Sequence, residues 1–285
     1  SVKNMLGYGR YDQPEGTWSD DSSLILSTMD SLLSGYDLDA IGMGFCEWLF
    51  CGKWTPYGYS FDSGFTTFAA LDDIFTKGVS AKESGQNTID DNGNGSLSRI
   101  IPAALYFADE ETEDYLDHIH AVSSITHSHP RALTGCGIYS LYVRELLCGE
   151  GDKYDALADA GEKAEEYYGK RDEYRGELEV FSRILNLTIS SLPETEIYSS
   201  GYVLHTLEAS IWSFLNTSNP HDTILKAVNL GLATDTTGTV AGSLAGLYYG
   251  LKDIPKEWIE KLAKKDEVDK LIGKFTDKVS EKLSS

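Results

Sequence analysis

The chain has 285 residues, of which 41% are hydrophobic and 24% charged, a composition that excludes a disordered or fibrous protein. The 45 acidic residues outnumber the 24 basic ones, and the net charge of -21 argues against a nucleic-acid partner because such a surface repels phosphates. No stretch approaches the roughly 18 apolar residues of a membrane span, so no membrane partner is expected. The start lacks a signal-peptide profile and the four cysteines lack CxxC spacing, which predicts a cytoplasmic protein with buried free thiols.

Taken in chain order, the apolar spacing predicts helices joined by loops. The first follows Asp20 and Asp21 and stops before Gly35, and Asp222 is the expected cap of a later one. The Gly-rich aromatic stretch 42–68 shows no clean period, residues 84–96 are typical of a loop, and 154–179 is predicted to be an exposed helix. The full set comprises 22–33, 69–75, 100–108, 112–124, 130–147, 154–179, 203–215, 222–230, 238–249 and a surface pair within 255–283. We therefore predict an all-α fold, a single compact helical domain over residues 1–285.

The run 238–249 carries a stripe of small residues. Gly238, Gly242 and Gly246 recur every four residues, which places them on one face of a helix. Small side chains on one face allow a neighbouring helix to approach closely. The run is short, so we expect this contact inside a folded core rather than in a membrane.

Two acidic motifs each stand at the start of a predicted helix, at 16–22 and at 233–238. Taken alone, each is an ordinary helix cap. Both nevertheless combine aspartate with Ser or Thr oxygens, and neither has a basic residue nearby in the sequence. Hard oxygen ligands of this kind suit Mg²⁺, Mn²⁺ or Ca²⁺. If the fold brings the two helix starts together, the sequence predicts a cation site.

Two further polar segments admit both a functional and a purely structural interpretation. The loop that contains Asn94, Gly95 and Ser96 offers backbone N–H groups that can hold a phosphate, but any tight surface turn has the same composition. In 126–130, His127 is placed to donate to an anion or a sugar hydroxyl, or else to cap the helix that begins at Pro130.

Five motifs together resemble the ADP-ribosylglycohydrolase family, and they occur in the family's order across nearly the whole chain. They are GTWSDDS at 16–22, NGSLSR at 94–99, THSHP at 126–130, SGYVLHTLEA at 200–209 and TDTTGTVAGSLAG at 234–246. The resemblance implies an all-helical fold with a two-metal Mg²⁺ (or Mn²⁺) centre. It also implies hydrolysis that removes ADP-ribose from a modified side chain, often arginine, so the implied partner is an ADP-ribosylated protein or an ADP-ribose conjugate.

The resemblance assigns metal ligands residue by residue. The first family motif corresponds to Ser19, Asp20 and Asp21, and the second, Asp-x-Asp-Thr, corresponds to 233–236 with Asp235 and Thr236 as ligands. Asp21 is therefore expected at the catalytic centre as well as in the metal site.

The resemblance also implies a set of substrate contacts. Asp62 is similar to a family aspartate that contacts the substrate ribose, and it is our candidate for the catalytic carboxylate that acts as base. Asn94, Gly95, Ser96 and His127 are similar to the groups that hold phosphate and ribose. Tyr202 is similar to a residue that offers an aromatic face to the adenine.

Two departures from the family pattern support an alternative. Ala233 stands where the family has a metal-binding aspartate, so one of the two ions is expected to bind weakly or be lost. An engineered Asp→Ala change and a naturally impaired relative both fit this position. The family's opening helix with Gly-Asp-Ala-x-Gly also does not precede Ser1 in this sequence. The alternative function is a catalytically impaired or non-enzymatic ADP-ribose-binding or structural relative.

Overall fold

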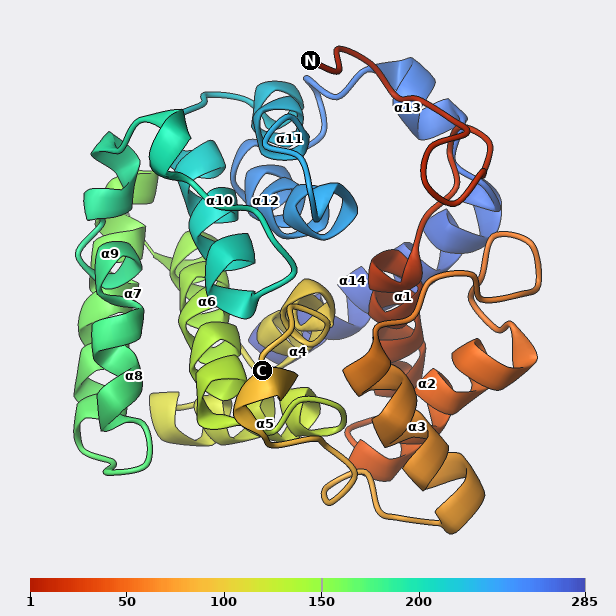
Figure 1. The fold of residues 1–285 in the computed structure, drawn as a ribbon, viewed down its shortest axis with the longest axis horizontal. Helices are drawn as coiled ribbons and strands as arrows, with labels where there is room; N and C mark the ends of the chain where they lie inside the picture. Colours follow the sequence, from red (N-terminus) through yellow and green to blue (C-terminus); the bar gives the residue numbers. More distant parts are fainter. Residues whose placement is uncertain (150, 285) are drawn as a thin grey trace.

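The computed structural model describes residues 1–149 and 151–284, and it confirms the all-α prediction (Figure 1). Within these ranges the regular elements are helices, and β-pairing is confined to two isolated bridges, Gln86 with His127 and Gly93 with Tyr202. The α-helices are α1 Asp20–Leu33, α2 Leu38–Cys51, α3 Phe65–Lys77, α4 Ile101–Tyr106, α5 Thr112–Ser124, α6 Pro130–Cys148, α7 Lys153–Gly169, α8 Arg175–Val180, α9 Ser182–Leu185, α10 Val203–Leu215, α11 Pro220–Val228, α12 Thr234–Tyr249, α13 Lys256–Glu260 and α14 Lys265–Leu283. Four 3₁₀ turns join them: η1 Ile89–Asp91, η2 Leu97–Arg99, η3 Thr188–Ser191 and η4 Glu194–Glu196.

Helix α6 is the central element and packs against α4, α5, α7, α10 and α12. In Figure 1, α7 to α9 form one edge of the molecule, and α2 and α3 lie on the opposite side, next to α1. The main cluster of buried apolar side chains extends from Leu24 in α1 to Val279 in α14 and draws on helices along the whole length of the chain. None of the helices in the described ranges has the length and hydrophobicity needed to cross a bilayer.

Helix α2 falls in the stretch 42–68, where no element was predicted, because glycines interrupt its apolar period. A Cβ on Gly42 would lie 2.9 Å from Cβ of Ala81, and one on Gly44 would lie 2.8 Å from Oγ of Ser27 in α1. The helix therefore uses glycine for close packing where the helical pattern would have an apolar side chain. Its start is fixed by Asp37, whose side chain accepts from the Ala40 N–H.

Three further predictions, on the exposure of α7, the cap of α11 and the burial of the cysteines, differ from the structure. Helix α7 is not simply exposed, because one face is buried through Ala156, Leu157, Ala160, Ala164 and Tyr168. Helix α11 is capped by Asn219, which accepts from the N–H of Asp222, so Asp222 is not the cap. All four cysteines are free thiols, but only Cys46 and Cys136 are buried, whereas Cys51 and Cys148 are exposed.

The small-residue stripe of α12 makes the predicted close helix contact. A Cβ on Gly238 would meet Val228 at 3.0 Å, and one on Gly242 would meet Ile224 at 3.2 Å, both of them side chains of α11. Gly246 has open space around it and takes no part. Close packing against α11 holds the start of α12 in place, and that start carries the second acidic motif.

The segment before α1 lies along α13 and the turn that follows it. The Ala263 N–H donates to the Gly16 carbonyl at 3.0 Å, and the Lys261 ammonium pairs with Glu15. Further along, the Val2 N–H donates to the side-chain oxygen of Asn229 at 2.5 Å. The N-terminal segment is thus held by residues from the last quarter of the chain.

Candidate active site

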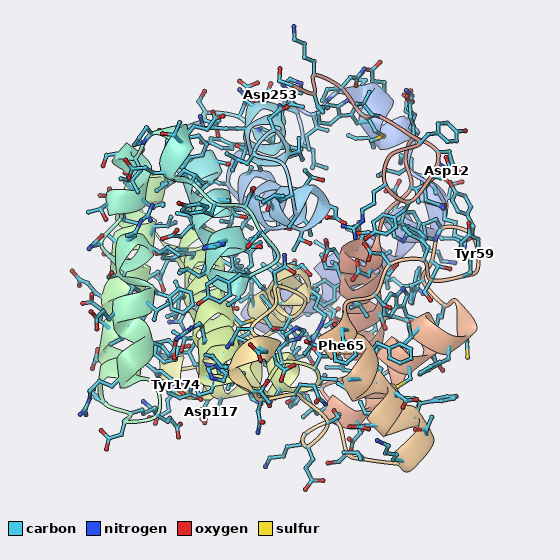
Figure 2. The ribbon with its side chains drawn as sticks, viewed as in Figure 1. Asp12, Tyr59, Phe65, Asp117, Tyr174 and Asp253 are labelled. Atoms are coloured by element: carbon cyan, nitrogen blue, oxygen red, sulfur yellow. The ribbon has the colours of Figure 1, made fainter. Side chains whose placement is uncertain are left out.

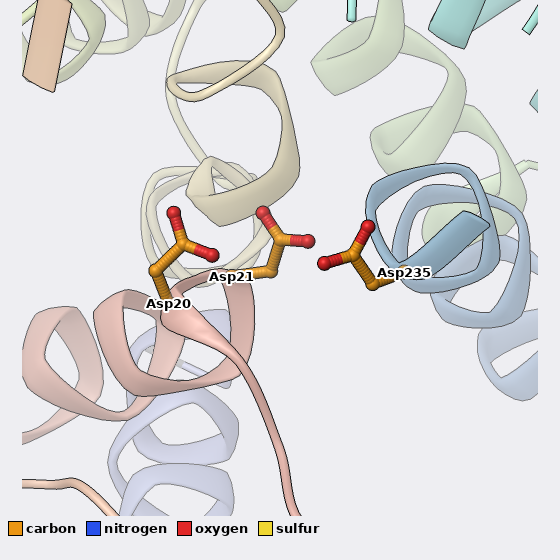
Figure 3. A group of neighbouring side chains, drawn as sticks. All are labelled: Asp20, Asp21 and Asp235. Carbon is orange, nitrogen blue, oxygen red and sulfur yellow. The ribbon is translucent and has the colours of Figure 1, made fainter. Parts of the chain in front are cut away.

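Two helix starts that are more than two hundred residues apart in sequence meet in space. Asp20 and Asp21 occupy the first turn of α1, and Asp235 occupies the first turn of α12. One carboxylate oxygen from each of the three lies within 4.8 Å of the others. Figure 3 shows the three side chains pointing toward one another across the gap between the two helices. Neither helix has a side-chain cap at its N-cap residue, Ser19 or Ala233, so the motifs do more than close a helix end.

The three carboxylates are electrostatically unfavourable without a cation. Burial, together with the nearby charge of Asp235, raises the pKa of Asp21 to about 7. Burial and then the charge of Asp21 also hold the pKa of Asp20 well above its ordinary value. The Oδ2 atom of Asp21 is buried and has no hydrogen-bond partner in the protein. Clustered carboxylate oxygens, one of them unpartnered, fit a hard divalent cation such as Mg²⁺ or Mn²⁺.

Hydroxyl groups supplement this cluster. Thr236 is buried and lines the cavity described below, and the hydroxyls of Thr236 and Ser98 oppose the rise in the pKa of Asp21. Ser19 is half-buried at the N-cap of α1 but does not line the cavity. Of the two predicted neutral ligands, Thr236 is therefore the better placed.

The cluster forms one side of a cavity of about 670 Å³, which is within the size range of small-molecule sites. We call the side formed by Asp20, Asp21, Asp62 and Asp235 the acidic wall. The predicted site residues that line the cavity are Asp20, Asp21, Asp62, Asn94, Gly95, His127, Asp235 and Thr236. One cavity thus collects residues from the beginning, the middle and the end of the chain.

Asp62 precedes α3 and has partners from the N-terminal segment. Burial raises its pKa, and the hydrogen bond from the Tyr11 hydroxyl and the charge of Arg10 oppose that shift. Burial and the contact with Asp62 in turn raise the pKa of Tyr11 to about 12, so the phenol stays protonated. Arg10 and Tyr11 both line the cavity. Arg10 thus brings a positive charge to Asp62, in the same cavity that the two acidic motifs line.

A second part of the cavity lining, which we call the glycine wall, consists of Gly93, Asn94, Gly95 and His127. Backbone hydrogen bonds fix its loop, since the Asn94 N–H donates to the Gly201 carbonyl at 2.9 Å. The Asn94 side chain is also occupied, because its Nδ2 donates to Thr206 Oγ1 at 2.9 Å. His127 is only 2% exposed, and burial followed by the charge of Arg99 lowers its pKa to about 3, so its imidazole is neutral.

Two predicted substrate contacts lie outside the cavity. Ser96 is fully buried behind the loop, where its oxygen accepts from the Ser123 hydroxyl at 2.9 Å. Tyr202 is half-buried, and its hydroxyl accepts from Arg131 at 3.0 Å beside the ion pair of Arg131 with Glu177. The neighbouring residues Ser200 and Gly201 line the cavity in place of Tyr202. The alternative that His127 caps α6 is wrong, because His129 is the residue that accepts from the Arg131 N–H.

Several cavity residues carried no signal in the sequence. Phe65, labelled in Figure 2, stands at the start of α3 and is 84% exposed. Leu232 is 80% exposed and has a φ of 57°. An exposed leucine in the left-handed region next to an acidic motif is a strained feature of the kind that collects at functional sites. Only backbone geometry reveals it. Arg10 and Tyr11 were missed because nothing in their local pattern connects them to α1 or α12.

The chain is similar to known proteins along its whole length. The family model described as ADP-ribosylglycohydrolase matches residues 2–284. The ADP-ribosylarginine hydrolase Tri1 of Pseudomonas putida (strain GB-1) is 30% identical over 97% of this chain and 71% of its own length. The ADP-ribosyl-[dinitrogen reductase] glycohydrolase of Rhodospirillum rubrum is 27% identical over 93% of this chain and 80% of its own length. A solved structure titled "ADP-ribosylglycohydrolase-related protein complex" is 28% identical, with a TM-score of 0.78 over 98% of this chain and 87% of that one. With its fold, its converging helix starts and these similarities, the chain belongs to the ADP-ribosylglycohydrolase family.

Proposed function

We propose that this protein is a metal-dependent hydrolase that removes ADP-ribose from modified protein side chains, with ADP-ribosylarginine as the first substrate to test. The convergence of Asp20, Asp21 and Asp235 around the unpartnered oxygen of Asp21 carries the proposal. Two of the similar proteins are named for hydrolysis at ADP-ribosylated arginine and at ADP-ribosylated dinitrogen reductase. Membership of the same family makes that reaction class the natural one for this cavity.

The acidic wall would hold the metal. Asp20, Asp21 and Asp235 would supply charged oxygens, and Thr236 and the N-cap residue Ser19 would supply neutral ones. When bound, Mg²⁺ or Mn²⁺ orients the ribose hydroxyls and lowers the pKa of a bound water. Two ions are expected from the family resemblance, and Ala233 removes one anionic ligand at the start of α12. We therefore propose one retained ion and one weak or lost ion.

Asp62 is the proposed general base. Hydrolysis adds water to the anomeric carbon and breaks the bond from that carbon to the acceptor nitrogen. Asp62 would take a proton from the attacking water, and the departing nitrogen would gain one, so that ADP-ribose and the free side chain result. A carboxylate whose pKa is raised by burial is a stronger base than an exposed one, and the Tyr11 hydroxyl fixes its orientation. Asp21 remains the second catalytic candidate because it lines the same cavity and lies among the converging carboxylates. The glycine wall would hold the diphosphate and ribose of the substrate.

Ala233 favours a second candidate function, an impaired relative that binds ADP-ribose without cleaving it. Both functions use the same cavity and the same acidic wall, so a binding measurement alone does not separate them. Turnover separates them, provided that its rate depends on the proposed metal ligands.

Hydrolysis of ADP-ribosylarginine, measured with Mg²⁺, with Mn²⁺ and with EDTA, tests the proposal. We expect release of ADP-ribose with either metal, none with EDTA, and a higher rate for Ala233→Asp because the variant restores an anionic ligand. Asp253→Asn is a matched control, since this aspartate is exposed and lies at the edge of the molecule, away from the cavity (Figure 2). Metal-strengthened binding of ADP-ribose with no turnover in either the natural chain or Ala233→Asp would favour the binding protein.

A further inference from the structure

Arg99 is a buried cation with an unusual set of partners. The side chain is fully buried, and its guanidinium lies 4.5 Å from the centre of the Phe45 ring. It donates to the Val122 carbonyl at 3.1 Å and to Thr126 Oγ1 at 2.7 Å, and more weakly to the Ser123 carbonyl at 3.5 Å. In residues 1–149 and 151–284 no carboxylate pairs with it. Removing one charge from water without an opposite charge is costly, so neutral oxygens and a ring have to hold this cation.

The Thr126 hydroxyl lies between Arg99 and His127 and interacts with both. Its oxygen accepts from Arg99 and lies 2.7 Å from Nδ1 of His127. Arginine can only donate, so the hydroxyl proton remains available for a second partner. Thr126 is fully buried, and His127 Nδ1 is the one acceptor that the described residues place beside that proton. If Nδ1 carried a proton instead, the hydroxyl hydrogen would be buried without an acceptor.

This arrangement determines which nitrogen of His127 carries the ring proton. With Nδ1 accepting, the proton of the neutral imidazole must be on Nε2. The Nε2 edge faces the glycine wall, since a Cβ on Gly93 would lie 3.5 Å from Nε2 and one on Gly95 would lie 3.0 Å from Cε1. His127 lines the cavity, and no described residue accepts from its Nε2. The glycines leave that N–H open to a ligand.

The surrounding charges agree with a neutral donor. Two charged groups act on the imidazole, with Arg99 behind it disfavouring a second proton and Asp91 favouring one. Asp91 is itself engaged by the backbone N–H and the hydroxyl of Thr88. Burial and the charge of Arg99 outweigh the charge of Asp91, and both keep the ring uncharged.

We propose that Arg99 and Thr126 are positioning residues that lock neutral His127 in its Nε2–H form, so that this N–H donates to an oxygen of ADP-ribose in the cavity. The identity of the ligand rests on the proposed function, whereas the form of the imidazole rests on Arg99 and Thr126 alone. The Nε2–H group thus offers an anionic ligand a fixed hydrogen-bond donor and adds no positive charge to the cavity.

Nitrogen-15 NMR of the imidazole rings tests the lock, because protonated and unprotonated ring nitrogens have distinct chemical shifts. The His127 signals are assigned by their absence from the spectrum of His127→Ala. We expect a single neutral form with the proton on Nε2 in the natural chain, and a mixture of the two neutral forms in Thr126→Val. Thr126→Ser keeps the hydroxyl, so it should return the spectrum to the Nε2–H form.

Titration with ADP-ribose supplies the second measurement. We expect Thr126→Val to bind about tenfold more weakly, which is the effect of removing one well-oriented hydrogen bond to a charged group, and Thr126→Ser to recover most of the affinity. A proton on Nδ1 in the natural chain overturns the proposal even if Thr126→Val fails to fold. Unchanged affinity in a folded Thr126→Val with mixed ring forms overturns the donor role. An intact Nε2–H form in a natural chain that does not bind ADP-ribose would instead count against the proposed function.

Discussion

The acidic wall and the glycine wall of the cavity differ in how charge is distributed in them. The acidic wall concentrates carboxylates, and burial raises the pKa values of Asp20, Asp21 and Asp62. One oxygen of Asp21 has no hydrogen-bond partner in the protein. The glycine wall is uncharged at its surface and has the Arg99 cation buried behind Thr126 and His127. The proposed metal ion would balance the charges of the first arrangement, whereas the cation behind the second belongs to the protein itself. A ligand that carries both sugar hydroxyls and phosphates matches the two walls. Its hydroxyls would face the acidic wall, and its phosphates would face the N–H donors of the glycine wall.

Removing the central carboxylate should have the largest effect. Asp21→Asn takes away the proposed metal ligand that lies between Asp20 and Asp235 (Figure 3). We therefore expect the hydrolysis rate to fall at least about a hundredfold, as for loss of a group that acts in the transition state. The variant should fold at least as well as the natural chain without metal, because the substitution removes a buried repulsion. Rates and melting temperatures in Mg²⁺ and in EDTA measure both effects. Full activity of the variant would show that Asp21 is not a metal ligand. Asp253→Asn is again the control.

Truncating the imidazole should have an intermediate effect on the other wall. His127→Ala removes the proposed donor to the ligand, and we expect ADP-ribose affinity to fall by about 1–3 kcal/mol. The buried Thr126 hydroxyl also loses its acceptor, so stability should fall by a similar amount, about 1–3 kcal/mol. Calorimetry and thermal unfolding of the variant measure the two quantities. His221→Ala, on the outer helix α11, is the matched control, and a loss of stability with unchanged affinity would show that His127 is only structural.

The smallest effect is a pH dependence that belongs to the acidic wall alone. A folded-state pKa of about 7 for Asp21, above its ordinary value of 3.8, means that the folded chain holds this proton more tightly than the unfolded one. The stability that this group contributes is therefore complete at low pH and is lost as the pH rises toward 7. In EDTA, the melting temperature should fall between pH 5 and pH 8 by about a few degrees, and Mg²⁺ should restore it most strongly at the higher pH.

Asp21→Asn separates this effect from the titration of the rest of the chain. The variant cannot ionise at that position, so its melting temperature should fall less over the same pH range. An equal fall in both proteins would assign the pH dependence to other groups. The glycine wall should contribute none of it, because His127 stays neutral throughout this range.

The two walls also differ in how much of them could be predicted from sequence. Asp20, Asp21 and Asp235 were correctly expected to meet, because clustered carboxylates at helix starts indicate a shared cation whatever the path of the chain between them. Ser96 was misassigned, since an Asn-Gly-Ser loop does not reveal which of its side chains turns inward. The role of Arg99 also escaped prediction, because a hydrogen-bond chain through Thr126 depends on three side-chain orientations that no spacing pattern encodes. Helix α2 was missed for a related reason, since its glycines pack where the pattern requires apolar side chains.

The anchoring of the N-terminal segment has a consequence for the order in which the site forms during synthesis. Arg10 and Tyr11 line the cavity, yet the segment that carries them is held by Glu15 against Lys261 and by Gly16 against Ala263. Those partners are synthesised more than two hundred residues later, and contacts of such high sequence separation close late in folding. A nascent chain that ends before α13 therefore has its first acidic motif but no Arg10 or Tyr11 fixed beside it. Arg10 and Tyr11 are thus among the last lining residues of the cavity to be fixed in place.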